Sequence, residues 1–379
     1  MIIRRSFLMT ITATLALFGT QAFAQSRGPV KVGGLTFLTG KFASYGAEYA
    51  SGMKIGVDYV NANGGVLGGR KLQLDIQDTA SDSAQAATLL RRLAADKDVV
   101  AVVGPTGTPD FLAVVPIAKT LDVPILTQAS VKFEHDEFPN NVIRVYLVEN
   151  PELLKWFFSK LQAAKGIKRV AFLTDRSNDA QQNSRRNAIE GMKGTGLELV
   201  ADEYIRAGDR DFAAVIDKML AGKPDSILLN ATTNEVTLFL TQARARGFKG
   251  QFMGTAGLGD PKIGELAKES AAGAITMLPL DVNAPAPLVK SFVAGFKAAN
   301  GDKPVSSFAA YTFDSVLLLA NAINRAGSTD RAKIMKALGE TKGMEGVTSN
   351  FTFKGKGDNI GQTPHLVEFT TAGGFRPFK

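Results

Sequence analysis

The sequence contains no cysteine among its 379 residues, and it has few histidines (His135, His365) and one tryptophan. Without cysteine the chain forms no disulfide bond, carries no thiol nucleophile and cannot be a lipoprotein anchored through that residue. Neither histidine has a partner at the spacing of a metal site. A Gly-x-Ser-x-Gly motif and a Gly-Lys-Ser/Thr phosphate loop are also missing. We therefore expect neither an enzyme nor a bound cofactor or metal.

Long hydrophobic runs are missing too, apart from the segment Phe7 to Phe18. Two arginines precede this segment, and Ala22 and Ala24 flank a small-residue cleavage site just before Gln25. This pattern is typical of a secretory signal peptide, so we expect residues 1–24 to be removed. The apolar run is too short for a membrane anchor, which needs about 20 residues. The sequence thus predicts an exported, soluble protein, for which a Gram-negative periplasm fits best.

Concentrated charge is absent. The formal net charge is +8, but the basic residues are scattered, with no run of five or more. This disfavours a nucleic-acid-binding protein. A mild basic excess could attract anionic ligands, although a solvated surface is the better explanation.

Strand-like and helix-like segments alternate along the rest of the chain, which favours parallel sheets covered by helices. The length favours two domains, because single hydrophobic cores stop growing near roughly 250–300 residues. The alternation restarts after Pro151, with the same order of elements but no sequence repeat. The C-terminal part predicts three helices and then a hairpin, at 287–299, 306–325, 329–338 and 349–370.

The segment "VVGPTGTPD", residues 102–110, joins a predicted strand to a predicted helix. Thr108 is a suitable helix N-cap, with Pro109 at the first helical position. The free N–H groups and the positive end of the helix dipole could hold a carboxylate there, and Thr106 and Thr108 add hydroxyl donors. A capped turn with no ligand is the simpler alternative.

Two further loops with small and polar residues follow predicted strands. They are "FLTGKFASYG", which leads to Tyr45, and "LTQASV", which contains Ala129, Ser130 and Val131. In an open parallel sheet, ligands bind outside the carboxyl ends of the strands. We therefore expect the three loops to meet at one edge of a sheet and to form a binding site.

The segment 37–82 resembles the N-terminal signature of the branched-chain amino-acid-binding receptors of ABC transporters, which are type I periplasmic binding proteins. The resemblance continues through "VVGPTG", "PILTQAS", "LTQARARGFKGQFMG", "AAYTFDSVLLLANAI" and "FTFKGKGD". It covers nearly all of the chain after the predicted signal peptide.

The resemblance implies an α/β fold of two lobes, each a mostly parallel sheet flanked by helices, joined by three crossovers with the ligand between them. Lobe 1 would comprise residues 28–146 and 277–350, and lobe 2 residues 147–276 and 351–379. The family works by hinge closure and delivers its ligand to a membrane permease. A monomer that binds a small carboxylate and no nucleic acid is the corresponding expectation.

The resemblance also implies site residues. The ligand carboxylate would lie at Thr108, Ala129 and Ser130, with Tyr45 and Tyr146 lining the cleft. Arg144 is a candidate ligand partner, although a structural ion pair is the simpler interpretation of its charge. Phe42 and Phe133 are further candidate wall residues.

Several departures from the family pattern bear on the ligand. Ala256 occupies the position of the acid that holds a ligand ammonium, and Val131 replaces a hydroxyl. Asp179 falls where the family has a lobe 2 tyrosine, and Thr232 and Thr233 replace another tyrosine pair. Because an unpaired buried ammonium is costly, we expect an organic acid without an α-amino group, such as an aromatic or a 2-oxo acid. If Asp179 replaces the missing acid, branched-chain or other amino acids are the alternative. A sensor of amides or similar small ligands has the same fold.

Overall fold

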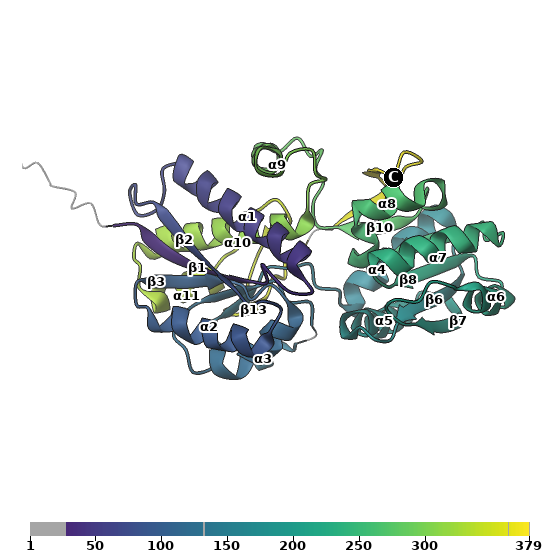
Figure 1. Cartoon of the computed structure of the whole chain (residues 1–379), viewed down its shortest axis with the longest axis horizontal. Helices are drawn as coiled ribbons and strands as arrows, with labels where there is room; N and C mark the ends of the chain where they lie inside the picture. The colour runs from purple at the N-terminus through teal and green to yellow at the C-terminus, as the bar shows by residue number, and fades with distance from the viewer. Residues whose placement is uncertain (1–27, 132, 363, 379) are drawn as a thin grey trace, which may run out of the picture.

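The computed structural model describes residues 28–131, 133–362 and 364–378; the side chains of Asp179 and Ala256 are outside this description. The predicted signal peptide, 1–24, lies outside it as well. The described chain folds into two α/β lobes that lie side by side (Figure 1), as the sequence predicted. None of the described helices is long and apolar enough to cross a membrane.

The first lobe is built on a six-stranded sheet of order β13-β5-β4-β3-β1-β2, in which every pairing is parallel. Its strands are β1 (Val30–Thr36), β2 (Leu72–Asp78), β3 (Val99–Val103), β4 (Ile125–Thr127), β5 (Val142–Arg144) and β13 (Gly357–Asp358). Its helices are α1 (Ala43–Ala62), α2 (Ser83–Ala95), α3 (Thr108–Ala118), α9 (Pro287–Asn300), α10 (Ser307–Ala326) and α11 (Arg331–Gly339). A short antiparallel pair joins β11 (Met344–Glu345) to β12 (Asn350–Phe351), and a 3-10 turn, η1, spans His135–Glu137.

The second lobe is built on a seven-stranded sheet of order β15-β14-β10-β9-β8-β6-β7. Its strands are β6 (Arg169–Asp175), β7 (Glu198–Ile205), β8 (Ser226–Asn230), β9 (Gln251–Gly254), β10 (Ile275–Leu278), β14 (His365–Phe369) and β15 (Phe375–Pro377). Only the pairings of β14 with β10 and β15 are antiparallel. The helices are α4 (Pro151–Lys165), α5 (Asp179–Met192), α6 (Ala213–Ala221), α7 (Thr233–Ala245) and α8 (Pro261–Ala267), with 3-10 turns η2 (Ala256–Gly259) and η3 (Lys268–Ser270).

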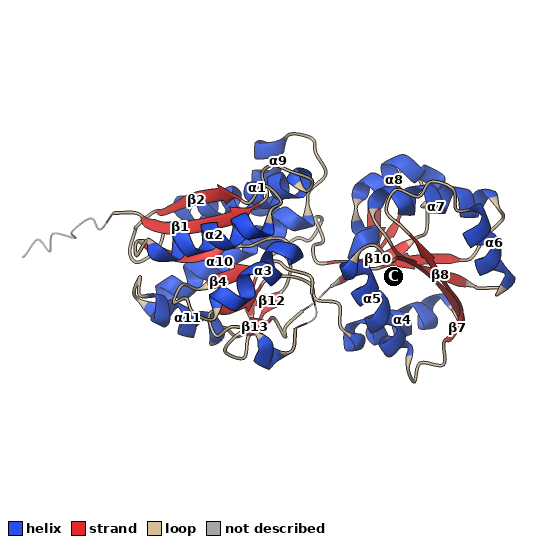
Figure 2. Cartoon of the chain, turned by 60° about the horizontal axis from the view of Figure 1, so that its bottom comes forward, coloured by secondary structure: helices blue, strands red, loops and turns tan. Residues whose placement is uncertain are grey.

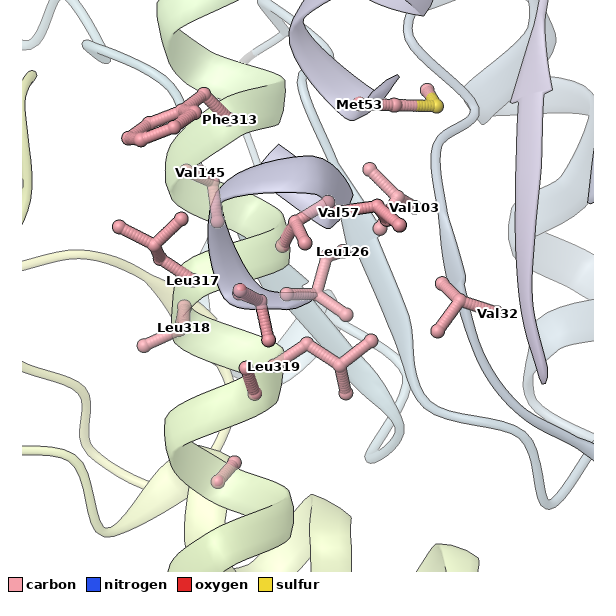
Figure 3. Close-up of a cluster of buried hydrophobic side chains, with 14 of the residues drawn as sticks. Val32, Met53, Val57, Val103, Leu126, Val145, Phe313, Leu317, Leu318 and Leu319 are labelled. Atoms are coloured by element: carbon pink, nitrogen blue, oxygen red, sulfur yellow. The ribbon is translucent and has the colours of Figure 1, made fainter. Parts of the chain in front are cut away.

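Both sheets are covered on both faces, which explains the continuous apolar character of their central strands. In β6, Ala171 and Leu173 pack with α6, α7 and α8, whereas Val170 and Phe172 pack with α4 and α5. In the first lobe α2 and α3 cover one face, and α1 and α10 cover the other (Figure 2). Figure 3 shows the side chains of α1, α10 and the sheet that form this second layer.

Glycine lets α1 and α10 approach closely. A Cβ atom on Gly52 would lie 1.9 Å from the carbonyl oxygen of Ala309, and one on Gly56 would lie 2.9 Å from Cβ of Val316. At the same crossing the Thr312 hydroxyl donates to the Tyr49 carbonyl at 2.7 Å. The two helices are therefore in backbone contact, and this contact fixes where α1 begins beside the sheet.

A buried carboxylate holds α10 against the loop that follows β11. Asp314 is fully buried and accepts hydrogen bonds from the Val347 and Thr348 N–H groups, both at 2.8 Å, and from the Thr348 hydroxyl at 2.5 Å. Burial raises the pKa of Asp314 to about 7, against the opposing effect of these donors. This contact anchors the chain on its way to the third crossover.

The chain passes between the lobes after β5, after β10 and after β13. Two predicted boundaries need correction. Residues 277 and 278 belong to β10 of the second sheet, and Gly357 and Asp358 pair with β5 of the first sheet. The third crossover therefore lies between residues 358 and 365 rather than near 350, because Phe351 and Phe353 are buried in the core of the first lobe.

Local predictions had mixed outcomes. Asp82 caps α2 by accepting from the Ala84 and Gln85 N–H groups, and Pro151 lies in the first turn of α4, both as predicted. The predicted cap at Thr108 is wrong: Gly107 is the N-cap, and α3 begins at Thr108. The predicted hairpin over 349–370 is wrong as well, because β13 and β14 belong to different sheets.

Candidate ligand-binding site

Three loops of the first lobe meet at the carboxyl edge of its sheet. They follow β1, β3 and β4, which are neighbours in the parallel sheet. The Thr36 and Thr106 hydroxyls are 2.8 Å apart, and the Thr127 hydroxyl donates to the Pro105 carbonyl at 2.8 Å. Thr106 is only 2% exposed. Thr106 therefore joins the loop after β3 to the end of β1, and its buried hydroxyl is not available to donate to a ligand.

The start of α3 and the loop 129–131 are joined directly. The Ser130 N–H donates to the Thr108 hydroxyl oxygen at 2.9 Å, and the Ala129 N–H donates to the Thr127 hydroxyl oxygen at 3.2 Å. Thr108 and Ser130 are half-buried, whereas Ala129 is fully buried. The Thr108 hydroxyl accepts from Ser130, so its own hydrogen is free to donate to an anion at the N-terminus of α3.

An aromatic surface borders these loops. The Tyr45 and Phe308 rings lie 5.3 Å apart, Phe308 and Tyr49 lie 5.2 Å apart, and Tyr49 continues through Phe37 to Phe42. Tyr45 is 38% exposed, so the tip of this surface reaches solvent. It offers an apolar wall for a ligand side chain.

Tyr146 lies where β5 leads into the first crossover. Its ring is 4.7 Å from Tyr311, and its hydroxyl hydrogen-bonds Ser130. Burial raises the pKa of Tyr146 to about 12, and Glu149 adds to the shift. Tyr146 therefore connects the loop 129–131 to the crossover as a neutral phenol.

Two residues predicted near the ligand have structural surroundings instead. Phe133 packs with Phe111 and Phe138, at 5.5 and 5.3 Å, on the face covered by α2 and α3. Arg144 is 1% exposed and pairs with Asp358 at 2.5 Å, which agrees with the structural ion pair.

In the second lobe, the loops after β6, β8 and β9 follow neighbouring strands and lie at its carboxyl edge. Thr232 is the N-cap of α7 and its hydroxyl donates to Glu235; the Thr233 hydroxyl donates to Asp260 at 2.6 Å. Asp260 in turn caps α8 through the Lys262 N–H. Asp179 is the first residue of α5, and Ala256 is the first residue of η2. Both predicted positions therefore lie where the loops after β6 and β9 end, at this edge of the sheet.

The two edges interact electrostatically. Burial raises the pKa of Tyr45, and the charges of Asp260, Glu48 and Glu235 raise it further. Burial likewise raises the pKa of Glu48, whose carboxylate accepts from the Ser306 hydroxyl at 2.5 Å and also interacts with Asp260. Tyr45 and Glu48 belong to the first lobe, and Glu235 and Asp260 to the second, so charges at the carboxyl edge of one sheet act on groups at the carboxyl edge of the other.

The sequence prediction missed Glu48, Glu235 and Asp260. Spacing could have found Glu48, which lies three residues, about one helical turn, after Tyr45 on α1. Glu235 and Asp260 gave no comparable signal, because only the fold brings the second edge to the first. Among the described residues no group of three or more His, Cys, Asp or Glu side chains could hold a metal ion.

Comparison with known proteins places the whole fold in context. A family model described as periplasmic binding protein matches residues 29–373. The leucine-, isoleucine-, valine-, threonine- and alanine-binding protein of Pseudomonas aeruginosa is 27% identical, over 93% of this chain and 92% of its own. The Leu/Ile/Val-binding protein of Escherichia coli is 26% identical, over 90% of each chain.

Solved structures give the same result. A branched-chain amino acid transporter substrate-binding protein from Streptococcus pneumoniae, in complex with isoleucine, superposes with a TM-score of 0.78 at 26% identity, covering 92% of this chain and 98% of that one. A leucine-binding protein from Thermotoga maritima has the same TM-score, identity and coverage. Both likenesses extend over the two lobes and the crossovers.

Proposed function

Because this chain belongs to the type I periplasmic binding proteins of the branched-chain amino-acid receptor family, we propose that it carries a small neutral amino acid to a membrane permease of an ABC transporter. The ligand would lie between the facing carboxyl edges of the two sheets. We further propose that the protein acts as a monomer in the periplasm, after cleavage of residues 1–24.

The observation that carries this proposal is the position of Glu48 and Asp260, which belong to opposite lobes and interact electrostatically near Tyr45. An α-amino acid has one positive and one negative end. The start of α3 with Thr108 and Ser130 suits the carboxylate. The carboxylates of Glu48, Asp260 and Glu235 suit the ammonium and would repel a ligand that is only an anion.

The relatives support the same ligand class, since the names of the Pseudomonas aeruginosa and Escherichia coli proteins state that they bind leucine, isoleucine and valine. The aromatic surface from Tyr45 to Phe308 would contact the ligand side chain. Closure of the lobes follows from this geometry, because the ligand gains contacts with the second lobe only when the edges approach.

A second candidate ligand is an organic acid without an α-amino group, aromatic or a 2-oxo acid. It is favoured by Ala256 and Val131, which replace the ammonium partners of the family pattern. Asp179 in the second lobe would instead favour an amino acid, if it replaces the missing acid.

Calorimetric titration with matched ligands separates the two candidates. L-leucine, 4-methyl-2-oxopentanoate and 4-methylpentanoate share one side chain and differ at the α-carbon. We expect leucine to bind at least about 10-fold more tightly than either acid, because neither acid has the ammonium that would hydrogen-bond a carboxylate of the site. Phenylalanine and phenylpyruvate provide the same comparison for an aromatic side chain.

Tighter binding of the oxo acid in either pair would favour the second candidate. No binding of any of the five compounds at millimolar concentration would reject both candidates.

A further inference from the structure

The guanidinium of Arg144 contacts the loop 129–131 in addition to its ion pair with Asp358. We propose that Arg144 is a positioning residue: it fixes the ligand loop 129–131 and ties it to the hinge. This inference rests on the proposed function for the identity of the loop, but it can be tested in the free protein.

The contacts of Arg144 divide between two parts of the chain. Nε and Nη2 donate to the two carboxylate oxygens of Asp358, at 2.5 and 2.9 Å. Nη1 donates to the Val131 carbonyl and, at 3.4 Å, to the Ala129 carbonyl. The guanidinium carbon lies 5.1 Å from the centre of the Phe138 ring. A buried cation thus has partners on three sides.

These contacts complete the fixation of the ligand loop. The N–H groups of Ala129 and Ser130 are held by the Thr127 and Thr108 hydroxyls, and Arg144 holds carbonyls of the same loop. Fixing donors and acceptors together leaves the loop with one conformation. Binding then costs less conformational entropy, which raises affinity without any contact between Arg144 and the ligand.

Asp358, the ion-pair partner of Arg144, lies next to the hinge. Asp358 is the last residue of β13, directly before the third crossover. Further along, the Val148 N–H in the first crossover donates to the Gln362 side chain at 3.0 Å. Arg144 and Asp358 are 214 residues apart in the sequence, and so are Val148 and Gln362. The first and third crossovers therefore run side by side with the same offset between paired residues. Arg144 therefore connects the ligand loop to the pair of crossovers that must move together.

Only arginine can serve both partners at once, because its planar fork presents donors in several fixed directions. Lysine at this position would keep the positive charge near Asp358 and lose the simultaneous contacts with the two carbonyls. Arg144→Lys is therefore the informative variant.

Arg331 provides the matched control. It is also a buried arginine of the first lobe, 8% exposed, and it donates to the Val99, Ala94 and Asp96 carbonyls and to Asp122. Val99 is the first residue of β3, Ala94 and Asp96 precede β3, and Asp122 follows α3, so these partners lie away from the carboxyl edge. Arg331→Lys should perturb the lobe to a similar degree without touching the ligand loop.

The first measurement is amide hydrogen exchange of the unliganded protein. We expect Arg144→Lys to speed exchange at residues 129–131 at least about 10-fold, and Arg331→Lys to leave exchange there unchanged. Equal exchange of the loop in the two variants would overturn the proposal, whatever the ligand proves to be.

The second measurement is calorimetric titration with L-leucine. We expect Arg144→Lys to weaken binding about 10-fold and Arg331→Lys less than about 2-fold. If wild-type protein does not bind leucine, the proposed function fails while the exchange result still decides the role of Arg144.

Asp358→Asn covers the case in which Arg144→Lys does not fold. It keeps the arginine and its carbonyl contacts but removes the charge of its partner. We expect Asp358→Asn to speed amide exchange at residues 129–131 by a factor between those of Arg331→Lys and Arg144→Lys. An exchange rate equal to that of the wild-type protein would count against the proposal.

Discussion

Replacement of Gly52 by alanine should lower the free energy of unfolding by about 3 kcal/mol, because α1 and α10 must separate to make room for one methyl group. The added Cβ would meet the Ala309 carbonyl oxygen at 1.9 Å and the Thr312 hydroxyl at 2.4 Å. Backbone atoms cannot move aside as a flexible side chain can. The loss should exceed the gain of about 1 kcal/mol in helix propensity.

Gly295→Ala is the control for this variant. Gly295 is also inside a helix, but its added Cβ would meet only Cγ2 of Ile55, at 2.9 Å. We expect its free energy of unfolding to stay within about 1 kcal/mol of wild type, since helix propensity offsets the small crowding. Denaturant unfolding followed by circular dichroism measures both. Similar free energies of unfolding for the two variants would show that α1 and α10 are not in tight backbone contact at Gly52.

Replacement of Thr108 by valine should weaken ligand binding about 10- to 100-fold, because the change removes a hydroxyl that can donate to the ligand carboxylate. The same hydroxyl oxygen accepts the Ser130 N–H at 2.9 Å, so the variant also releases the neighbouring loop. Valine has nearly the same shape as threonine, and the fold should be retained. Titration calorimetry with the best ligand of the matched panel measures the loss.

Thr241→Val is the corresponding control. Thr241 lies on α7 of the second lobe, where its hydroxyl donates to the Thr237 carbonyl at 3.0 Å. Its removal should change affinity less than about 2-fold. Binding by the Thr108 variant as tight as that of the control would remove Thr108 from the site.

Much of the architecture could be predicted from local sequence signals. Alternating strands and helices predicted two parallel sheets, and the polar loops after β1, β3 and β4 were expected to meet at one edge. The structure brings these loops together through contacts such as Thr36 with Thr106. Caps of purely local origin, at Asp82 and Asn150, are recognisable because a side chain bonds its own helix.

Other features depend on distant partners. The two-residue strand β13 pairs with β5, with Asp358 beside Arg144, 214 residues earlier, and no local pattern predicts it. Thr108 suited an N-cap locally, but its hydroxyl oxygen accepts the Ser130 N–H and Gly107 takes the cap position. The charge of Asp260 acts on Glu48 only after both lobes are assembled, so the sequence argument from Ala256 left out this negative charge at the proposed site.

Small-angle X-ray scattering with and without saturating ligand tests most directly whether the ligand joins the two carboxyl edges. We predict a smaller radius of gyration on binding to wild-type protein, and at the same ligand concentration a weaker change for Thr108→Val. A ligand that binds tightly while the radius of gyration stays constant would contradict a site shared by Thr108 and Ser130 on one lobe with Asp260 on the other.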